Sequence, residues 1–291
     1  MKNIMPELPE VEITKQKLIE QKIKGAVVED FWTDRPQNLK LFSDIKIQKD
    51  IRGRKIISIE RRGKVLFLGL SGRDKKNLAF HFRMSGRLIL AEDVKKFKDT
   101  STRAIVFLKG GKKILFRDPR KFGVIWYGGP DELKQDPYLG FLGPDMLEVT
   151  FRVFLERLKK RKGKIKSLLL DQKIVSGIGN IIADEALWYS KLHPETEIKK
   201  MSKAQIRKLY SDIRRVIHNI IKAGGTTLRD WAHPDGKEGG YEKVRRIYGR
   251  GKKNCFRCKN PVSRAVIAGR GTTFCPKCQK IDKVSTPAGG R

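Results

Sequence analysis

The pattern of apolar and polar positions changes markedly along the chain near residue 130. Before that point, apolar runs of four to six residues stand between glycine-containing turns, a pattern typical of short strands. The predicted strands are 25–28, 55–59, 65–70, 104–108 and 113–116. Their regular spacing predicts a β-sandwich or barrel over roughly residues 25–130.

After residue 150 the apolar positions recur every three or four residues, which is the period of an amphipathic helix. The predicted helices of this half are 151–159, 165–171, 181–190 and 202–223. One further helix is predicted over 13–23, with Ile13, Leu18 and Ile19 facing the core. The fold class is therefore α+β in two domains, and residues 131–150, which contain Gly143 and Pro144, are the predicted linker.

Composition adds a strong charge to this picture. The 291 residues, enough for two domains with cores of their own, carry 65 Lys and Arg against 32 Asp and Glu, a formal net charge of +33. Such an excess favours a polyanionic partner, with nucleic acid first, although a generally solvated basic surface or a ribosome-associated protein would share it. No apolar run approaches the roughly 20 residues that a membrane span needs, so none is predicted.

All four cysteines lie in two CxxC pairs, Cys255/Cys258 and Cys275/Cys278, sixteen residues apart. Four thiolates in two such pairs suit one tetrahedral zinc ion, and a site closed by four protein ligands is structural. A redox pair is the alternative for a CxxC motif. The sequence therefore predicts a zinc finger with one zinc ion and a reducing compartment.

The run Met5-Pro6-Glu7-Leu8-Pro9-Glu10-Val11-Glu12 places a proline, a carboxylate and a helix start within eight residues. If Pro6 were the first residue, its free secondary amine would be a nucleophile with a pKa near ~7.7–8.0 or lower at a helix N-terminus. Such an amine can form an iminium with a carbonyl-like carbon. A proline-punctuated helix entry without chemistry is the alternative.

The run PELPEVE resembles the amino terminus of bacterial formamidopyrimidine-DNA glycosylases, and further motifs extend the resemblance over roughly residues 5–280. The resemblance implies a β-sandwich domain over 5–130, a linker over 131–150 and a helix-two-turn-helix domain with a lesion-capping loop over 151–250. A β-hairpin zinc finger over 251–280 and a disordered tail over 281–291 would follow.

By the same resemblance, the catalytic residues are Pro6, Glu7, Lys64 and Arg270. Lys64 follows Arg61-Arg62-Gly63, a predicted hairpin tip, where an ordinary solvated lysine is the alternative. Arg270 lies in GRGTT between the CxxC pairs, where a guanidinium can grip a phosphate. The metal ligands are Cys255, Cys258, Cys275 and Cys278.

The resemblance also implies a set of DNA-binding residues: His81, Met84, Arg120, Phe122, Lys162 and Asn180. Met84, Arg120 and Phe122 would fill the gap left by an extruded base, since an inserted side chain must replace lost stacking. Asn180 follows Ser176-Gly177-Ile178-Gly179 and is expected to cap the next helix beside a phosphate, whereas an ordinary helix–helix turn is the alternative.

The function implied is a bifunctional glycosylase and abasic-site lyase that removes 8-oxoguanine and formamidopyrimidines from double-stranded DNA, as a monomer in the bacterial cytoplasm near the nucleoid. An endonuclease VIII-like enzyme for oxidised pyrimidines is one alternative. The other is a non-catalytic damaged-DNA-binding protein, because Met1-Lys2-Asn3-Ile4 precede the matching methionine and would block Pro6. A misassigned start or a trimmed leader would free it.

Overall fold

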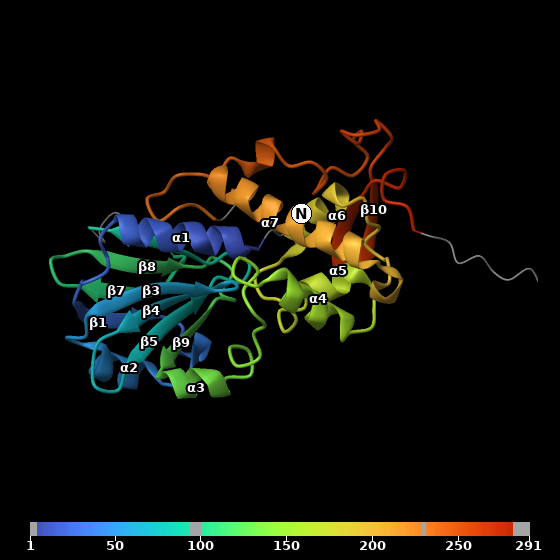
Figure 1. Ribbon diagram of the computed structural model, residues 1–291. Coiled ribbons are helices and arrows are strands. Elements are labelled where there is room, and N and C mark those ends of the chain that lie inside the picture. Colours follow the sequence, from blue (N-terminus) through green and yellow to red (C-terminus); the bar gives the residue numbers. More distant parts are fainter. Residues whose placement is uncertain (1–4, 93–99, 228–230, 282–291) are drawn as a thin grey trace, which may run out of the picture.

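The computed structural model describes residues 5–92, 100–227 and 231–281. The leader, residues 228–230 of the expected capping loop and all of the expected tail except Ile281 lie outside the described residues. A two-layer β domain stands on one side of the molecule and a helical domain with a strand hairpin on the other (Figure 1). The predicted α+β architecture is thereby confirmed. Within the described ranges, no helix is long and apolar enough to cross a membrane.

Two sheets form the β domain. The five-stranded sheet runs in the order β2 (Leu39–Lys40), β9 (Val124–Gly128), β5 (Lys76–His81), β4 (Val65–Leu70), β3 (Ile56–Arg62). The four-stranded sheet runs β1 (Val28–Thr33), β7 (Thr102–Leu108), β8 (Lys113–Arg117), β6 (Arg87–Ala91). Phe31 and Phe116 of one sheet share a buried core with Leu68 and Phe80 of the other. The apolar faces of the two sheets thus cover each other.

The first predicted strand is wrong in position. Residues 25–27 lie before β1, whose sequence Val28-Glu29-Asp30-Phe31-Trp32-Thr33 has acidic residues at two positions. Buried and exposed residues do not alternate regularly along β1, and Trp32 is 41% exposed. The apolar residues 25–28 therefore resembled a strand more closely than β1 itself. Strands β5, β6 and β9 and the helices η1 (Pro36–Asn38), α2 (Asp44–Ile51) and α3 (Pro130–Gln135) were also not predicted.

Helix α1 (Leu8–Glu20) starts inside the run Met5–Glu12, where the sequence indicated a helix start, but five residues before the predicted segment 13–23, and it ends three residues before that segment does. The reason for the early start is a capping box, in which the Glu7 N–H donates to Glu10 Oε2 at 2.9 Å, followed by Pro9 in the first turn. Ile13 and Leu18 are buried as predicted, whereas Ile19 is 48% exposed, which corrects that prediction.

The helical domain contains α4 (Phe151–Lys159), α5 (Ile165–Leu170), α6 (Asn180–Tyr189), η3 (Ile198–Lys200), α7 (Lys203–Lys222) and η4 (Tyr241–Lys243). The hairpin of β10 (Ser263–Ile267) and β11 (Arg270–Phe274) lies at its far end (Figure 1). The four predicted helices of this half all form within two residues of their predicted ends.

Helix α1 belongs to both domains. Leu8 is fully buried in the core of the helical domain, while Val11 and Leu18 are fully buried in the core of the sandwich. Helix α1 contacts both strand β3 of the sandwich and helix α7 of the helical domain. The two domains therefore share one helix as a common packing element, and the residues just before it lie at their junction.

A buried ion network also joins the domains. The Arg61 guanidinium on β3 donates through Nε to Glu12 Oε2 at 2.7 Å and through Nη2 to Asp145 Oδ1 at 3.0 Å. Asp145 also accepts the N–H of Gly63 at 2.7 Å, and the Arg61 side chain is 3% exposed. One guanidinium thus ties α1, the β3–β4 turn and the segment that enters the helical domain.

We expect Arg61→Met to lower the free energy of unfolding by about 3–5 kcal/mol, because the buried Asp145 carboxylate would lose its counter-charge and Glu12 would keep Lys15 alone. The matched control is Arg52→Met, since Arg52 forms an exposed pair with Asp30 in the same domain. That change should stay below about 1 kcal/mol. Urea unfolding of both variants measures the difference, and equal effects would show that the buried network contributes no more than a surface pair.

Candidate active site and zinc finger

The Glu7 carboxylate lies at the N-terminus of α6, although the two are separated by more than 170 residues in the sequence. The Ile181 N–H donates to Glu7 Oε1 at 2.8 Å and the Ile182 N–H to Oε2 at 3.1 Å. Free N–H groups at a helix N-terminus attract an anion, and here a side chain from the other domain supplies it. Asn180, predicted to cap this helix, instead is its first residue and makes no side-chain cap, which corrects that prediction.

Close approach at this point requires glycine. A Cβ built on Gly179 would lie 2.2 Å from Glu7 Cδ, and one on Gly177 would lie 2.4 Å from Leu8 Cδ1. Gly177 also has a φ of +105°, in the region that favours glycine. The two glycines of the turn before α6 therefore let that turn contact the start of α1.

Burial raises the pKa of Glu7, against the opposing effect of the Lys64 charge and the α6 amides. Burial and the Glu7 charge raise the pKa of Glu10 to about 7. Glu10 Oε1 in turn accepts the Thr226 N–H at 3.0 Å, which connects α1 to the first residues of the expected capping loop. A buried carboxyl that holds its proton near neutral pH can act as a general acid.

Lys64 projects from the turn between β3 and β4 and is 4% exposed. Burial lowers its pKa, and the nearby carboxyl of Glu7 acts in the opposite direction. A desolvated lysine gives up its proton more readily than a surface lysine, as proton transfer requires. The predicted hairpin tip is confirmed by the pairing of Arg62 with Val65.

The zinc-finger hairpin closes another side of the site. Asn180 Nδ2 donates to the Gly271 carbonyl at 2.9 Å, next to Arg270. Behind it, Lys166 Nζ contacts Asp184 Oδ1 at 2.5 Å and Thr272 Oγ1 at 2.6 Å, with both charged side chains fully buried. The hairpin is thus fixed to α5 and α6 by hydrogen bonds to a buried ion pair.

These groups surround one pocket of about 490 Å³ at the junction of the domains. Its lining includes Glu7, Lys64, His81, Met84, Asn180 and Arg270, all of which the sequence singled out. Pro6 is itself buried, and Met5, directly before it, lines the pocket. The fold brings these residues together from five separate segments. Their roles are predictions from the sequence.

Asp118 organises the loop that carries Arg120 and Phe122. Its carboxylate accepts the Gly123 N–H at 2.6 Å and the Ser85 hydroxyl, which follows Met84. The Arg120 guanidinium lies 5.3 Å from the centre of the Phe122 ring, and Phe122 is 53% exposed. Neither residue is among those that line the pocket, but an exposed aromatic next to an arginine suits insertion between bases.

Lys162 lies elsewhere, exposed in the turn after α4 and outside the pocket lining. Lys166, four residues further on, lies next to the region of Asn180 and Arg270 instead. The sequence did not predict Lys166 as a site residue. Tyr138 and Tyr248 also line the pocket. Tyr138 was missed because it falls in the predicted linker, and Lys166 because a lysine within an apolar run resembles a solvated helix position.

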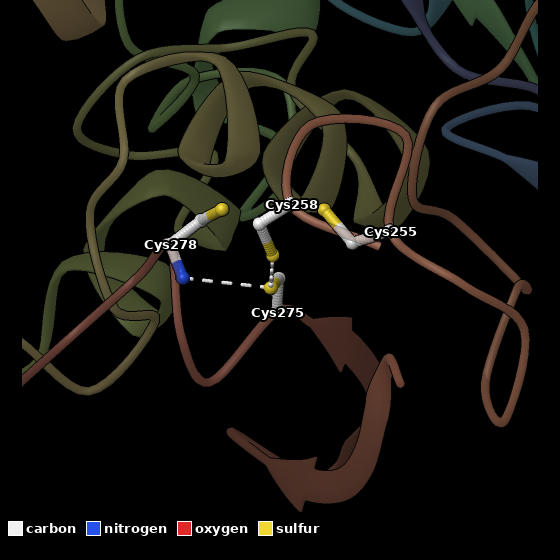
Figure 2. Close-up of side chains that lie close together, drawn as sticks. All are labelled: Cys255, Cys258, Cys275 and Cys278. Atoms are coloured by element: carbon white, nitrogen blue, oxygen red, sulfur yellow. Dashed lines mark hydrogen bonds between the residues drawn. The ribbon is translucent and has the colours of Figure 1, made fainter. Parts of the chain in front are cut away.

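The four cysteines gather at one point, with all Sγ atoms within 4.8 Å of one another (Figure 2). Cys258 Sγ and Cys275 Sγ are 3.4 Å apart, and Trp188 Nε1 donates to Cys255 Sγ at 3.4 Å. Four converging sulfur atoms with an N–H donor beside them fit a tetrahedral zinc ion, which would stabilise the hairpin that carries Arg270.

A two-domain protein with a large positive net charge, a glycine-containing turn between two helices at its interdomain pocket and four clustered cysteines that suit zinc is of the nucleic-acid-binding class. Three family models match the chain: the formamidopyrimidine-DNA glycosylase N-terminal domain over 5–125, the H2TH domain of these glycosylases over 142–231, and a zinc finger found in FPG and IleRS over 252–281.

Whole-chain relatives agree with the family models. The formamidopyrimidine-DNA glycosylase of Heliobacterium modesticaldum is 38% identical over 95% of this chain and 100% of its own, and that of Legionella pneumophila (strain Lens) is 37% identical over 95% and 99%. The crystal structure of MutM (FPG) from Thermus thermophilus superposes with a TM-score of 0.84 at 35% identity, covering 96% and 100%.

A complex of the Lactococcus lactis Fpg with abasic-site DNA gives a TM-score of 0.85 at 32% identity, covering 94% of this chain and 100% of that one. The protein described here belongs to the formamidopyrimidine-DNA glycosylase family. The resemblance seen in the sequence, including the four-cysteine zinc finger, is confirmed.

Zinc removal should weaken DNA binding roughly 10- to 100-fold, the effect of one or two charge-assisted hydrogen bonds, because the hairpin would no longer hold Arg270. Cys275→Ser should lower both the zinc content and the affinity for an abasic-site duplex. Lys277→Ala, an exposed change between two ligands, is the control. Metal analysis and fluorescence anisotropy measure the two quantities. Full affinity in a zinc-free protein would contradict the expected role.

Proposed function

We propose that the protein is a bifunctional DNA glycosylase and abasic-site lyase of base excision repair, acting on oxidised purines in double-stranded DNA. The observation that carries this proposal is the pocket between the domains, where the start of α1 meets Lys64, Asn180 and Arg270. The family it belongs to has this activity, and the charge of +33 favours a DNA partner. Work on chromosomal DNA would place it in the cytoplasm, at the nucleoid.

In the proposed mechanism, the Pro6 nitrogen attacks C1′ of the damaged nucleotide, the bond from C1′ to the base breaks, and the base leaves with the proton that the Pro6 nitrogen loses. Glu7 gives its proton to the ring oxygen O4′, so the sugar opens and an iminium links Pro6 to C1′. The raised pKa of Glu7 supports this role, since more of the carboxyl carries a proton at neutral pH.

The iminium acidifies the C2′ proton, whose removal expels the 3′ phosphate by β-elimination. A second elimination expels the 5′ phosphate, and water then hydrolyses the iminium to free the amine. Lys64 is proposed to move protons in these steps and to contact the phosphate, since it is buried beside Glu7. Arg270 and Asn180 are proposed to bind phosphates at the damaged nucleotide.

The remaining contacts hold the DNA open. Met84, Arg120 and Phe122 are proposed to fill the space left by the extruded base, with Arg120, a pure donor, facing the acceptors of the orphaned cytosine. His81 and Lys162 are proposed to contribute to DNA binding from the pocket wall and from the exposed basic turn. The zinc ion has a structural role, because its four ligands leave no open position.

The chemistry requires a free amine at Pro6, which exists only when residues 1–5 are absent. Met5 lines the pocket, so its removal would also open the pocket toward Pro6. We therefore expect a chain expressed from Met5, with that methionine removed, to form a borohydride-trapped covalent complex with an 8-oxoguanine:cytosine duplex. The chain beginning at Met1 should not be trapped unless its leader is trimmed.

An undamaged duplex and a duplex with an oxidised pyrimidine are run in parallel with this trapping assay. Preferential trapping on the pyrimidine duplex would favour the endonuclease VIII-like alternative. Binding of the 8-oxoguanine duplex by both chains with no trapping of either would overturn the lyase and leave a damaged-DNA-binding protein.

Glu7→Gln should slow base excision by about 10²- to 10⁴-fold, because the amide cannot donate a proton to O4′. In the unsubstituted chain, excision should slow as pH rises through the raised pKa of Glu7, since only the protonated carboxyl acts as the acid. The rate of cleavage at a preformed abasic site should fall much less, because the open aldehyde form of that sugar needs no proton on O4′ to open its ring.

Single-turnover rates on the two substrates across pH measure this difference. Glu20→Gln, an exposed change on the same helix, is the control and should leave both rates unchanged. Equal losses on both substrates would assign Glu7 a purely structural role at the N-terminus of α6.

A further inference from the structure

Tyr138, which follows α3, is held rigidly at the pocket wall. Its ring stacks on the buried Trp126, with the ring centres 6.0 Å apart and the planes 14° from parallel. The Tyr138 N–H donates to Asp136 Oδ1 at 2.8 Å, while Trp126 Nε1 donates to Asp136 Oδ2 at 2.8 Å. One carboxylate therefore fixes both members of the stack, and the hydroxyl has a defined position.

The contacts of His81 determine which of its nitrogens carries a proton. The Arg83 N–H donates to Nδ1 at 2.9 Å, in a turn where Arg83 has a φ of +51°. Nδ1 is therefore an acceptor. Burial, together with the charges of Arg83 and Lys64, lowers the pKa of His81 well below its usual value, so the ring is neutral. The single ring proton thus lies on Nε2.

Nε2 lies 3.0 Å from the Tyr138 hydroxyl oxygen, so the Nε2–H group donates to that oxygen. A hydroxyl has one proton to donate in addition to its lone pairs, and this proton must point away from His81. Accepting a hydrogen bond also polarises the O–H bond and makes it a stronger donor. The sequence of bonds from Arg83 through His81 therefore ends in a directed O–H donor at the pocket wall.

The pocket around this donor suits an anion. Arg83 lies over the Tyr138 ring at 5.2 Å, and Lys64 and Arg270 line the same pocket. Of the described residues that line it, Glu7 is the one carboxylate, and its oxygens accept the α6 amides. Strand pairing places Val65 opposite His81, so Lys64 is next to the residue that directs Tyr138.

We propose that Tyr138 binds a phosphate oxygen of the damaged strand beside the lesion through its hydroxyl, and that His81 is the positioning residue that directs this donor. The inference rests on the proposed function, because it takes the occupant of the pocket to be damaged DNA. It gives His81 an indirect part in DNA binding, with both ring nitrogens engaged inside the protein.

The test uses the full chain and a duplex with a tetrahydrofuran abasic-site analogue, which cannot form an iminium and so needs no free amine. Tyr138→Phe keeps the stack on Trp126 and removes only the hydroxyl. We expect the Kd to rise about 10-fold, the effect of one hydrogen bond to a charged acceptor. The slope of log Kd against log salt should stay unchanged, because a hydroxyl displaces no counterion.

Tyr210→Phe is the matched control, since its hydroxyl donates to the Val149 carbonyl at 2.7 Å within the helical domain. This change should leave the Kd unchanged. His81→Leu should weaken binding as much as Tyr138→Phe, with no further loss when the two are combined. His81→Gln should restore most of the affinity, because its amide can donate to the same hydroxyl, whereas a merely structural role for His81 predicts no such rescue.

Duplexes with one uncharged methylphosphonate at each position near the analogue identify the acceptor. The loss caused by Tyr138→Phe should disappear at one phosphate flanking the analogue on its own strand and persist at the others. If Tyr138→Phe and the methylphosphonate lowered the affinity additively at every position, the inference would be overturned while the proposed function would stand. A Kd for Tyr138→Phe equal to that of the unsubstituted chain would have the same meaning. If the unsubstituted chain did not prefer the analogue duplex to an undamaged one, the proposed function would fail, and this inference with it.

Discussion

The contact between the Glu7 carboxylate and the first amides of α6 is the interaction on which the site depends. It satisfies N–H groups that a helix cannot pair internally, and it fixes the proposed acid in one orientation. It also sets where Pro6 lies, because Pro6 directly precedes Glu7. A single carboxylate thereby contributes to helix capping, to domain assembly and to the geometry of the proposed nucleophile.

The rest of the junction reinforces this arrangement with buried polar groups rather than with apolar area alone. Arg61 ties α1 to the segment that enters the helical domain, and Lys166 ties the zinc-finger hairpin to α6. A buried ion pair contributes little net stability, but breaking it lowers the free energy of unfolding strongly. Such pairs therefore favour one relative placement of the segments they join over others. Such a placement suits a pocket whose groups come from segments far apart in the chain.

Local patterns predicted the parts of the fold that local interactions decide. Strand β4 and the helices from α4 to α7 were found from periodicity, and the zinc finger from cysteine spacing. Strand β1 was misplaced because two acidic residues weaken its alternation. Contacts between distant segments leave no periodic signal, so neither the cap that Glu7 forms on α6 nor the placement of Tyr138 beside His81 was predicted.

The shared helix α1 has a consequence for the order in which the protein matures. Synthesis proceeds from the N-terminus, so Leu8 and Glu7 leave the ribosome long before Ile181 and Ile182, their partners in the helical domain. Until those residues emerge, the sandwich can pack against Val11 and Leu18, but the proposed acid has no helix N-terminus to hold it. A nascent or truncated chain that ends before α6 therefore lacks an assembled site, whereas the complete chain can assemble the site once α6 has formed.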